Sequence, residues 1–436
     1  MTPSPIVSER DRPPLDDNDR SEVSPGARPT GLISILSQRA VFTVLIVVLV
    51  MMSGLGMVFP IVPLYARSFD VSLVAVGAFI SAFGVTRLVF DLVGGVFVDR
   101  WGERSVTVGG LATMAIASVV TGLAGSFGLA ASMWALGGAG SAVAFGGLYS
   151  YLLKVVPKEQ MARTLGLFYG AFNVGIIGGS PIGGFVAHRF GLRGPFLAYG
   201  AVLAASALLY FLLIDASPQH APATQEARAD APRRGPLGGL GPLLENRGFL
   251  AACAGNLAYL WMVAAVFETL VPLMAREQLG MSTSSIGLLF AVGTAAELAA
   301  LYPAGAWADR RGRRAVLIPA LAALAVMTVV VGWSSGPVVL GVTLGVLGLT
   351  SGVAGVPPAA MLSDVTPSER SGTAVGVFRF CGDLGFVFGP AVAGAAAAGL
   401  GFPLAFAISA APTAAALIVA AWAPETLGVR PTAEAA

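Results

Sequence analysis

Long apolar stretches separated by short polar segments follow one another along this chain. From Ala40 onward each stretch has about 20 to 27 residues. A helix of that length, rising 1.5 Å per residue, crosses a bilayer core of about 30 Å. The pattern predicts twelve transmembrane helices, at residues 40–65, 73–98, 105–124, 129–154, 163–188, 195–214, 249–275, 284–308, 314–333, 338–362, 372–397 and 402–422.

Three polar segments lie outside this pattern. Residues 1–39 are rich in Pro, Asp and Arg and lack the apolar core of a signal peptide, so they are predicted to be a disordered cytoplasmic tail. Residues 215–248 form a predicted cytoplasmic linker, and residues 423–436 a second cytoplasmic tail. The helices between them make two sets of six, at 40–214 and 249–422.

Composition excludes a soluble enzyme. Charged residues are 11% of the chain, hydrophobic residues 56%, and the mean hydropathy is +0.79, whereas soluble domains carry about 25% charged residues. A net charge of +2 argues against a nucleic-acid partner. Two cysteines and two histidines are too few for a metal site, and neither lysine follows the glycine of a phosphate-binding loop. We therefore expect no cofactor and no direct use of ATP.

Basic residues predict the orientation. With the first segment inside the cell, 20 of the 26 Lys and Arg residues fall in cytoplasmic segments and four in outer loops. Such a bias follows the positive-inside rule, and it predicts a multi-pass protein of the cell membrane with both termini in the cytoplasm.

An internal repeat relates the two sets of helices. A shift of 210 residues places glycines and charged loop residues on their counterparts, as in Gly95-x3-Asp99-Arg100-x-Gly102-x-Arg104 and Gly305-x3-Asp309-Arg310-x-Gly312-x-Arg314. At a shift of 209, residues 62–67 match residues 271–276. We infer an all-α membrane protein of two pseudo-symmetric six-helix bundles, with a substrate site between them near the bilayer midplane.

At these residues the chain resembles the major facilitator superfamily of transporters. The family's signature loop after the second helix is carried by Gly95, Asp99, Arg100, Gly102 and Arg104, with Glu103 in place of one arginine. The second copy is complete, with Gly305, Asp309, Arg310, Gly312, Arg313 and Arg314. The resemblance implies that these loops act as a latch between domains, and that the aspartates bond the following arginines.

Two further features resemble the drug/proton antiporter branch of that family, and they favour export. The fifth helix carries glycines and a proline typical of exporters, at Gly166, Gly175, Gly179, Pro181, Gly183 and Gly184, although the proline stands one place late. The eleventh helix repeats the pattern at Gly376, Gly385, Gly389 and Pro390. The branch usually has an arginine in the fourth helix, where this chain has Trp134.

Four of the charges inside the predicted helices form a quartet. Arg87 and Asp91 lie four apart in the second helix, as do Arg379 and Asp383 in the eleventh. In the family fold these helices contact each other across the domain interface, so we expect Asp91 to meet Arg379 and Arg87 to meet Asp383. We hypothesise a cytoplasmic gate that closes in the outward-facing state. A permanent clamp or two intrahelical pairs are the alternatives.

Two acids stand apart from that quartet. Glu268, in the seventh helix, has no charged helical neighbour, and it is a candidate to bind a proton and a cationic substrate in turn. Glu297, in the eighth helix, is expected to face the fifth helix at Tyr169 and Asn173 and to hold a transferable proton. Asp91 and Asp383 are further proton-coupling candidates. For Glu268, a protonated acid bonded to a neighbouring helix is the alternative.

The predicted function is proton-coupled efflux of a small amphipathic compound or drug by alternating access. A proton-coupled importer or uniporter of a metabolite and a non-transporting sensor on the same fold remain open. Partners are the substrate, protons and the lipid bilayer, and the protein is expected to be a monomer. Adaptable side chains are the cavity candidates, with lipid-facing packing as the alternative: Met51, Met52, Phe59, Tyr149, Asn256, Tyr259 and Trp261, together with Glu268.

Overall fold

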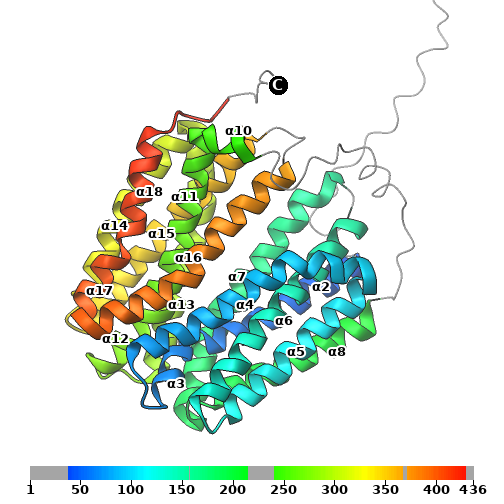
Figure 1. Ribbon diagram of the computed structural model, residues 1–436, viewed down its shortest axis with the longest axis vertical. Helices are drawn as coiled ribbons and strands as arrows, with labels where there is room; N and C mark the ends of the chain where they lie inside the picture. Colours follow the sequence, from blue (N-terminus) through cyan, green and yellow to red (C-terminus); the bar gives the residue numbers. More distant parts are fainter. Residues whose placement is uncertain (1–37, 157, 215–239, 367–370, 429–436) are drawn as a thin grey trace, which may run out of the picture.

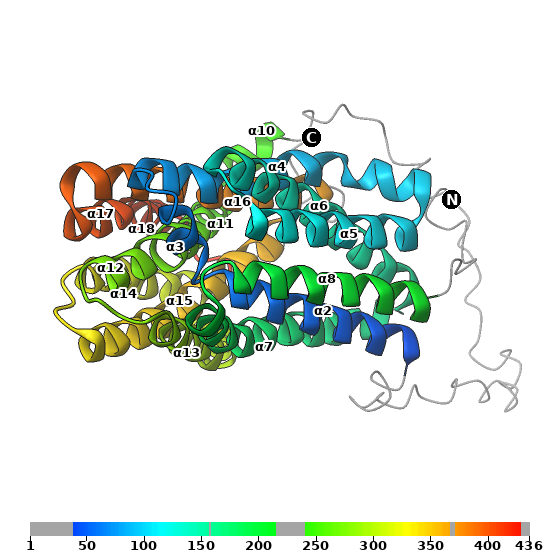
Figure 2. The same ribbon diagram turned by 90° about the horizontal axis from the view of Figure 1, so that it is seen from below.

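The computed structural model describes residues 38–156, 158–214, 240–366 and 371–428, and every regular element in these ranges is a helix. Twelve spans are long and apolar enough to cross a membrane, which confirms the predicted count. In Figure 2 the long helices run roughly along one common direction, as expected of membrane-crossing helices. Residues 1–37 of the predicted tail and 215–239 of the predicted linker lie outside the described residues.

The N-terminal half contains one group of helices, drawn from blue to green in Figure 1. Its central contacts join α2 to α7 and α8, α4 to α6, and α5 to α6 and α8. The elements of this half are α2 (Arg39–Val58), α3 (Val62–Arg67), α4 (Leu73–Trp101), α5 (Glu103–Leu123), α6 (Phe127–Val155), α7 (Lys158–Phe190) and α8 (Gly194–Leu213).

The C-terminal half repeats this arrangement, with α11 beside α15, α16 and α18, and with α13 and α14 beside α15. One element differs in kind, because the seventh span contains a π-helix, η2, at Met262–Leu270. The other elements are α10 (Leu240–Glu245), α11 (Arg247–Trp261), α12 (Val271–Glu277), α13 (Thr283–Arg311), α14 (Arg313–Val331), α15 (Pro337–Val365), α16 (Ser371–Leu400), α17 (Phe402–Ser409) and α18 (Ala411–Trp422).

Equivalent local signals begin and end equivalent helices in both halves. Ser72 accepts a hydrogen bond from the backbone N–H of Ala75 at the start of α4, and Ser282 does the same for Ser285 at the start of α13. The helices end at Gly102 and Gly312, whose φ angles of 75° and 104° favour glycine. We call the face with these two glycines the latch face, and the face with residues 68–72 and 278–282 the far face.

The two halves meet through α4 with α16 and α7 with α13. A Cβ added at Gly77 would lie 2.3 Å from the Pro390 carbonyl oxygen, and one at Gly184 would lie 2.5 Å from the Thr283 carbonyl oxygen. Glycine is therefore required for this backbone approach. All these contacts lie in the part of each helix near the far face, so the halves are closed together there.

One predicted boundary differs from the structure. The last residues of the predicted linker form α10 and the first residues of α11, because Asn246 caps α11 by accepting bonds from the N–H groups of Gly248 and Phe249. α18 ends at Trp422, where the predicted tail begins, and Glu425 of that tail contacts the start of α14.

Candidate functional site

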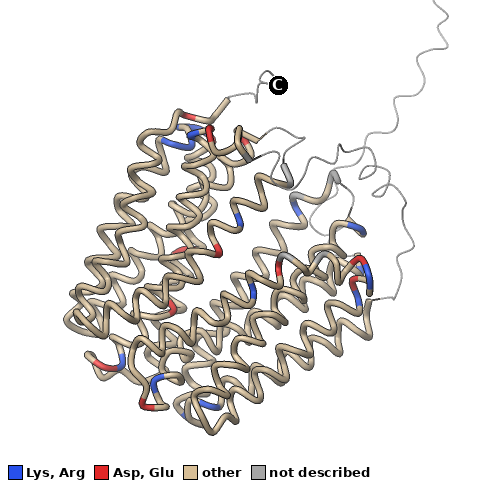
Figure 3. The backbone as a smooth tube through the Cα atoms, viewed as in Figure 1, with Lys and Arg blue, Asp and Glu red and all other residues tan. Residues whose placement is uncertain are grey.

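Charged residues gather at the helix ends, and few lie along the middle of the spans (Figure 3). The predicted quartet belongs to this internal set and lies where α4 and α16 separate. These helices run antiparallel, with Gly77 beside Pro390 and Gly84 beside Phe386 and Val387. Continuing that register places Arg87 opposite Asp383 and Asp91 opposite Arg379. Further toward the latch face, a Cβ at Gly94 would meet no atom within 4 Å.

The ion pair present in this conformation lies within one helix. The Arg87 Nε is 3.8 Å from the Asp91 Oδ2. Among the described residues, no ion pair joins α4 to α16, so the two predicted cross-helix pairs are not formed here. The physical reason is the divergence of the helices beyond Gly84. Arg87 nevertheless acts electrostatically on Asp383 of the other half.

Glu268 lies in the π-helix and is 5% exposed. Pro272 has no N–H to donate, so the carbonyl four residues before it loses its α-helical partner. The widened turn is held instead by backbone bonds from residue i to i−5, such as the Val271 N–H donating to the Val266 carbonyl oxygen. The Thr269 hydroxyl also donates to the Ala264 carbonyl oxygen at 2.7 Å. Single π-turns are frequent at functional sites, and the sequence analysis did not predict this one.

The Glu268 carboxyl makes no hydrogen bond or ion pair that the structure records among the described residues, and Arg87 is the charge that acts on it. Arg87 comes from the N-terminal half and Glu268 from the C-terminal half, so the two groups interact across the domain interface. Together with Asp383, they place one cation and two acids near that interface.

Glu297 points into its own half, contrary to the expectation that it faces the fifth helix. The Tyr259 hydroxyl donates to the Glu297 Oε1 at 2.5 Å. Glycine at position 352 brings α15 close to α13, with an added Cβ only 2.4 Å from the Glu297 carbonyl oxygen. Asn173 instead donates to the Tyr169 carbonyl oxygen of its own helix.

The cavity candidates separate into two groups. Met51 and Met52 are fully buried, and Met52 lies against α7, so both belong to the core of the N-terminal half in this conformation. Phe59 and Trp261 are half-buried, Tyr149 is exposed, and the Asn256 amide donates to the Phe378 carbonyl oxygen at 2.8 Å. The apolar pattern could not distinguish core from cavity, because both environments accept methionine and aromatic residues.

Trp134, which occupies the position of the usual arginine, is 4% exposed and packs among aromatic rings. Its ring is stacked with Phe79 at 6.0 Å and tilted against Phe83 at 4.9 Å between centroids, and Phe196 meets it edge-on. This position therefore serves packing near the far face.

The glycine–proline motifs line helix contacts. In α7, an added Cβ at Gly179 or Gly183 would lie 2.0 Å from a carbonyl oxygen of α2, and Gly175 approaches α2 as closely as 2.7 Å. Gly385 and Gly389 contact α11 in the same way. Gly166 and Gly376 meet nothing within 4 Å. Gly77, Gly287 and Gly394, which make the contacts between halves, were missed because isolated glycines are common in these spans.

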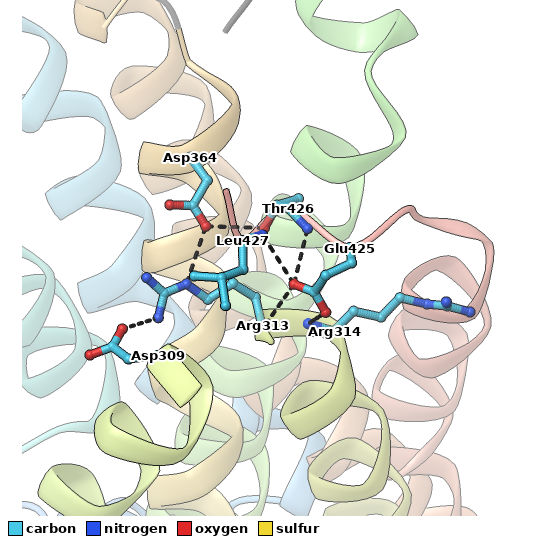
Figure 4. Close-up of polar contacts among 7 residues, drawn as sticks. All are labelled: Asp309, Arg313, Arg314, Asp364, Glu425, Thr426 and Leu427. Atoms are coloured by element: carbon cyan, nitrogen blue, oxygen red, sulfur yellow. Dashed lines mark hydrogen bonds and ion pairs between the residues drawn. The ribbon is translucent and has the colours of Figure 1, made fainter. Parts of the chain in front are cut away.

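On the latch face of the C-terminal half, Arg313 connects three elements (Figure 4). Its guanidinium pairs with Asp309 at the end of α13, and its Nε donates to the Asp364 Oδ2 of α15 at 3.1 Å. The Glu425 carboxylate accepts hydrogen bonds from the N–H groups of Arg313 and Arg314 at 2.7 and 3.1 Å, so it caps α14. Asp364 and Glu425 were missed because they lie outside the signature loop.

Glu425 is ionised more readily than a free glutamate. Burial disfavours its charged form, but backbone N–H donors of Leu427, Arg313, Ala315 and Thr426 outweigh that cost, and the pKa of its carboxyl lies below the usual value. The negative charge of Glu425 also lies at the positive N-terminal end of the α14 dipole, which stabilises it.

The latch face of the N-terminal half has the same connection with its charges reversed. Lys154 of α6 pairs with Glu103 of α5, and the Ser150 hydroxyl donates to the Glu103 Oε1 at 3.2 Å. Arg104 donates to the Phe211 carbonyl oxygen, just as Arg314 donates to that of Ala421, 210 residues later in both cases. Of the remaining signature residues, Arg100 lies over the Trp101 ring at 5.8 Å, and Arg310 is exposed.

On the far face, one ion pair joins the halves. The Arg67 Nε of α3 lies 2.9 Å from the Glu277 Oε1 of α12, with side chains 41% and 31% exposed. Arg67 and Arg276 each also donate to a backbone carbonyl oxygen of the following loop, at Val71 and Met281. Both arginines lie in predicted outer loops, but the sequence pattern does not indicate the pair with Glu277.

A model described as the Major Facilitator Superfamily matches residues 44–293 and, a second time, residues 260–436. Among curated proteins, the Multidrug resistance protein 2 of Bacillus subtilis (strain 168) is 26% identical over 182 residues, 41% of this chain and 45% of that relative. The Quinolone resistance protein NorA of Staphylococcus aureus is 24% identical over 161 residues, 37% of this chain and 41% of that relative. The chain spans about half the length of the curated relatives it matches.

Two solved structures have the same fold. A bacterial homologue of the human lysosomal transporter Spinster, in an inward-facing and occupied conformation, superposes with a TM-score of 0.70 at 14% identity, covering 87% of this chain and 94% of that one. A D-xylose-proton symporter superposes with a TM-score of 0.69 at 16% identity, covering 90% and 99%. At these identities the likeness shows the fold alone.

Proposed function

We propose that this chain, which belongs to the Major Facilitator Superfamily of transporters, exports a small amphipathic organic compound in exchange for protons. It is a multi-pass protein of the cell membrane, and as a transporter it is not an enzyme. The observation that carries the proposal is Glu268, a buried acid within a π-helix that the structure records with no ion pair among the described residues.

Glu268 suits an exchange of protons for cations. An isolated carboxyl in a low-dielectric site is stable when protonated and costly when charged and unpaired. A bound cation or a nearby positive charge lowers that cost, so substrate and proton compete for one group. Arg87 supplies a positive charge from the other half, and its distance from Glu268 changes whenever the two halves move.

The conformation supports a cycle of alternating access. The halves are closed together near the far face and joined there by Arg67 and Glu277. If the latch face is cytoplasmic, as its excess of basic residues indicates, this is the inward-open state. Closing the latch side would continue the α4–α16 register and bring Arg87 to Asp383 and Asp91 to Arg379, so the quartet is the proposed gate.

The substrate class rests on two further observations. The curated relatives carry names for resistance to multiple drugs and to quinolones. The half-buried Phe59 and Trp261 and the exposed Tyr149 supply aromatic surface for an amphipathic ligand.

Transport in inverted membrane vesicles tests the direction. A lipophilic cationic dye should accumulate when the vesicle interior is acidified, and the accumulation should collapse when a protonophore removes the gradient. Vesicles without the protein provide the control. Dye uptake into intact cells driven by an acid exterior would instead establish import.

A charge swap tests the gate. Arg87→Asp and Asp383→Arg should each abolish transport, because each places like charges across the closing α4–α16 contact. The double variant restores the opposite charges and should recover transport. If the double variant stays inactive while its abundance and thermal stability match the wild type, the proposed Arg87–Asp383 pair is wrong.

A further inference from the structure

The only two cysteines of the chain meet each other inside the C-terminal half. Cys253 comes from α11 and Cys381 from α16, far apart in sequence, and both are free thiols. The two thiols are close enough to interact electrostatically, and the bond from Asn256 to Phe378, three residues from each cysteine, sets both at the same level of the α11–α16 contact. Cys253 is 6% exposed, whereas Cys381 is half-buried, so one side of the pair is accessible.

The surrounding helices hold this pair in place. α11 and α16 lie side by side (Figure 1), and an added Cβ at Gly385 would be 2.4 Å from the Leu257 carbonyl oxygen. One turn from Cys253, the Asn256 amide donates to the Phe378 carbonyl oxygen at 2.8 Å. The backbones therefore approach closely at the level of the thiols. Neither helix can rotate without breaking the hydrogen bond from the Asn256 side chain to the Phe378 carbonyl oxygen.

We propose that Cys253 and Cys381 form a two-coordinate thiolate site for a soft divalent d10 cation of the Hg²⁺ class. Thiolates select soft metal ions. A tetrahedral zinc site needs four ligands, and the described part of the chain contains no cluster of three or more His, Cys, Asp or Glu side chains. Two converging thiols match an ion that is satisfied by two sulfur ligands.

Charge balance favours a divalent ion. Binding breaks two S–H bonds, forms two metal–sulfur bonds and releases two protons to water, with no change of oxidation state. With M²⁺ the product M(SR)₂ is neutral, whereas a monovalent ion would leave a net negative charge in a low-dielectric interior, where an unpaired charge is costly. A neutral dithiolate is the species that this buried position can hold.

The site also connects two functional segments. α11 leads directly into η2, which carries Glu268, and Cys381 stands between Arg379 and Asp383 on α16. A metal bridge would fix the helix of the proposed gate to the helix of the proposed proton-binding acid. The inference does not depend on the direction or substrate of transport.

Thiol titration of the purified full-length protein tests the site with Hg²⁺ as the probe. In the folded wild type, one equivalent of Hg²⁺ should remove both thiols from reaction with an aromatic disulfide reagent added after denaturation. If the cysteines bind independently, one equivalent removes one thiol and two equivalents are needed, which would overturn the proposal. A mercury-linked dimer at one equivalent would also overturn it.

Competition with a monothiol measures the chelate effect. The wild type should retain Hg²⁺ against a monothiol by roughly 10²- to 10⁴-fold better than Cys253→Ser or Cys381→Ser, because the second thiol acts intramolecularly. Both variants keep a small side chain, and their helicity and melting temperature identify any misfolding. Equal retention in wild type and in folded single variants would refute a shared site.

Discussion

In both halves of the molecule an ion pair joins the third span to the fourth, but the positions of the acid and the base are exchanged. In the N-terminal half, Glu103 of α5 pairs with Lys154 of α6. In the C-terminal half, at positions 210 residues later, Arg313 of α14 pairs with Asp364 of α15. The repeat therefore preserves a complementary pair between the third and fourth spans, while the sign of each member is free to change.

The reversal has one structural consequence. An arginine has five N–H donors and can bond two carboxylates, so Arg313 also reaches Asp309 and ties α13 to the latch. Glu103 is an acceptor when ionised and cannot pair with Asp99, the counterpart of Asp309. The C-terminal latch thus connects three spans through one side chain, whereas the N-terminal pair connects two.

The halves also differ in the first span of each. In the N-terminal half α2 ends at Val58, and a short turn precedes α3. In the C-terminal half the corresponding chain continues through η2, and Glu268 stands where a shift of 209 places Phe59. Proline follows in both, at Pro63 and Pro272, yet only the C-terminal break holds an acid. For this reason, proton coupling is proposed for the C-terminal half alone.

The largest effect is expected for the variant that removes this difference between the halves. Glu268→Gln deletes the only titratable group of η2, and proton-driven dye transport should fall by about tenfold or more, the factor that corresponds to about 1.4 kcal/mol. Flux in proteoliposomes with an imposed pH gradient measures it. Glu245→Gln, the same change at an exposed position of α10, is the control and should transport normally. Full proton-driven flux in the Glu268 variant would rule out this acid as the coupling group.

The second prediction compares the ion pair of Arg313 with Asp364 and the ion pair of Lys154 with Glu103. Arg313→Ala should lower the free energy of unfolding by about 3 kcal/mol, because it leaves mostly buried Asp364 unpaired. Lys154→Ala should cost less, about 2 kcal/mol, because it leaves buried Glu103 unpaired but breaks one ion pair where Arg313→Ala breaks two. Thermal unfolding in detergent provides the comparison.

Reversing the C-terminal pair sharpens this test. Arg313→Glu combined with Asp364→Lys copies the N-terminal arrangement, and it should recover most of the stability lost in either single variant, apart from the bond to Asp309. Additive losses in the double variant would mean that the sign of each charge matters to the fold.

The third prediction weakens the contact between the halves on the far face. Glu277→Gln removes an exposed ion pair worth less than about 1 kcal/mol, so it should shift the ratio of conformations by at most about fivefold. The readout is a cysteine introduced as Ser284→Cys in a chain lacking the native cysteines. This cysteine should react faster with a maleimide when Glu277→Gln is also present than when Glu277 is unchanged. Arg276→Gln is the matched control because Arg276 bonds a carbonyl of its own half. Equal acceleration by both changes would contradict a specific role for the pair.

The smallest predicted effect is the pH dependence of the C-terminal latch. The pKa of Glu425 is lowered in the folded protein, so its stabilisation is fully present above the unfolded pKa, near 4.5, and is lost as the pH falls through the folded pKa. Glu425→Gln should cost only about 0.5 kcal/mol at pH 7, the low end for a helix cap, because the Gln carbonyl oxygen still accepts hydrogen bonds while the negative charge is lost. The melting-temperature difference from wild type should shrink toward pH 3, whereas a constant difference would exclude a role for the carboxylate charge.

Much of the architecture was predictable from the chain. Apolar stretches gave the twelve spans, and the 210-residue repeat gave the equivalence of loops such as Gly102 and Gly312. The pairing of Arg87 with Asp383 stays a prediction, because α4 and α16 diverge beyond Gly84 in this conformation. Which face of the protein is open was not predictable. The conformations open to either face use different contacts between the halves, and the sequence is compatible with both sets.

Partner choice within the spans was the part that sequence could not supply. Glu297 turned toward Tyr259 and away from the fifth helix, and Met51 and Met52 entered the core. In a soluble helix a polar face would reveal the rotation. Lipid-facing, core-facing and cavity-facing positions here are all apolar, so the pattern carries little rotational information.

The sequence by itself determined that the chain crosses the membrane twelve times, that its halves are copies, and where its scarce charges lie along the spans. The tertiary structure decided which of these groups meet. A hydrogen bond such as Tyr259 to Glu297, or a thiol pair such as Cys253 and Cys381, requires the rotation, tilt and register of two helices at once. These quantities arise from the packing of glycines against neighbouring backbones, which no single span specifies alone.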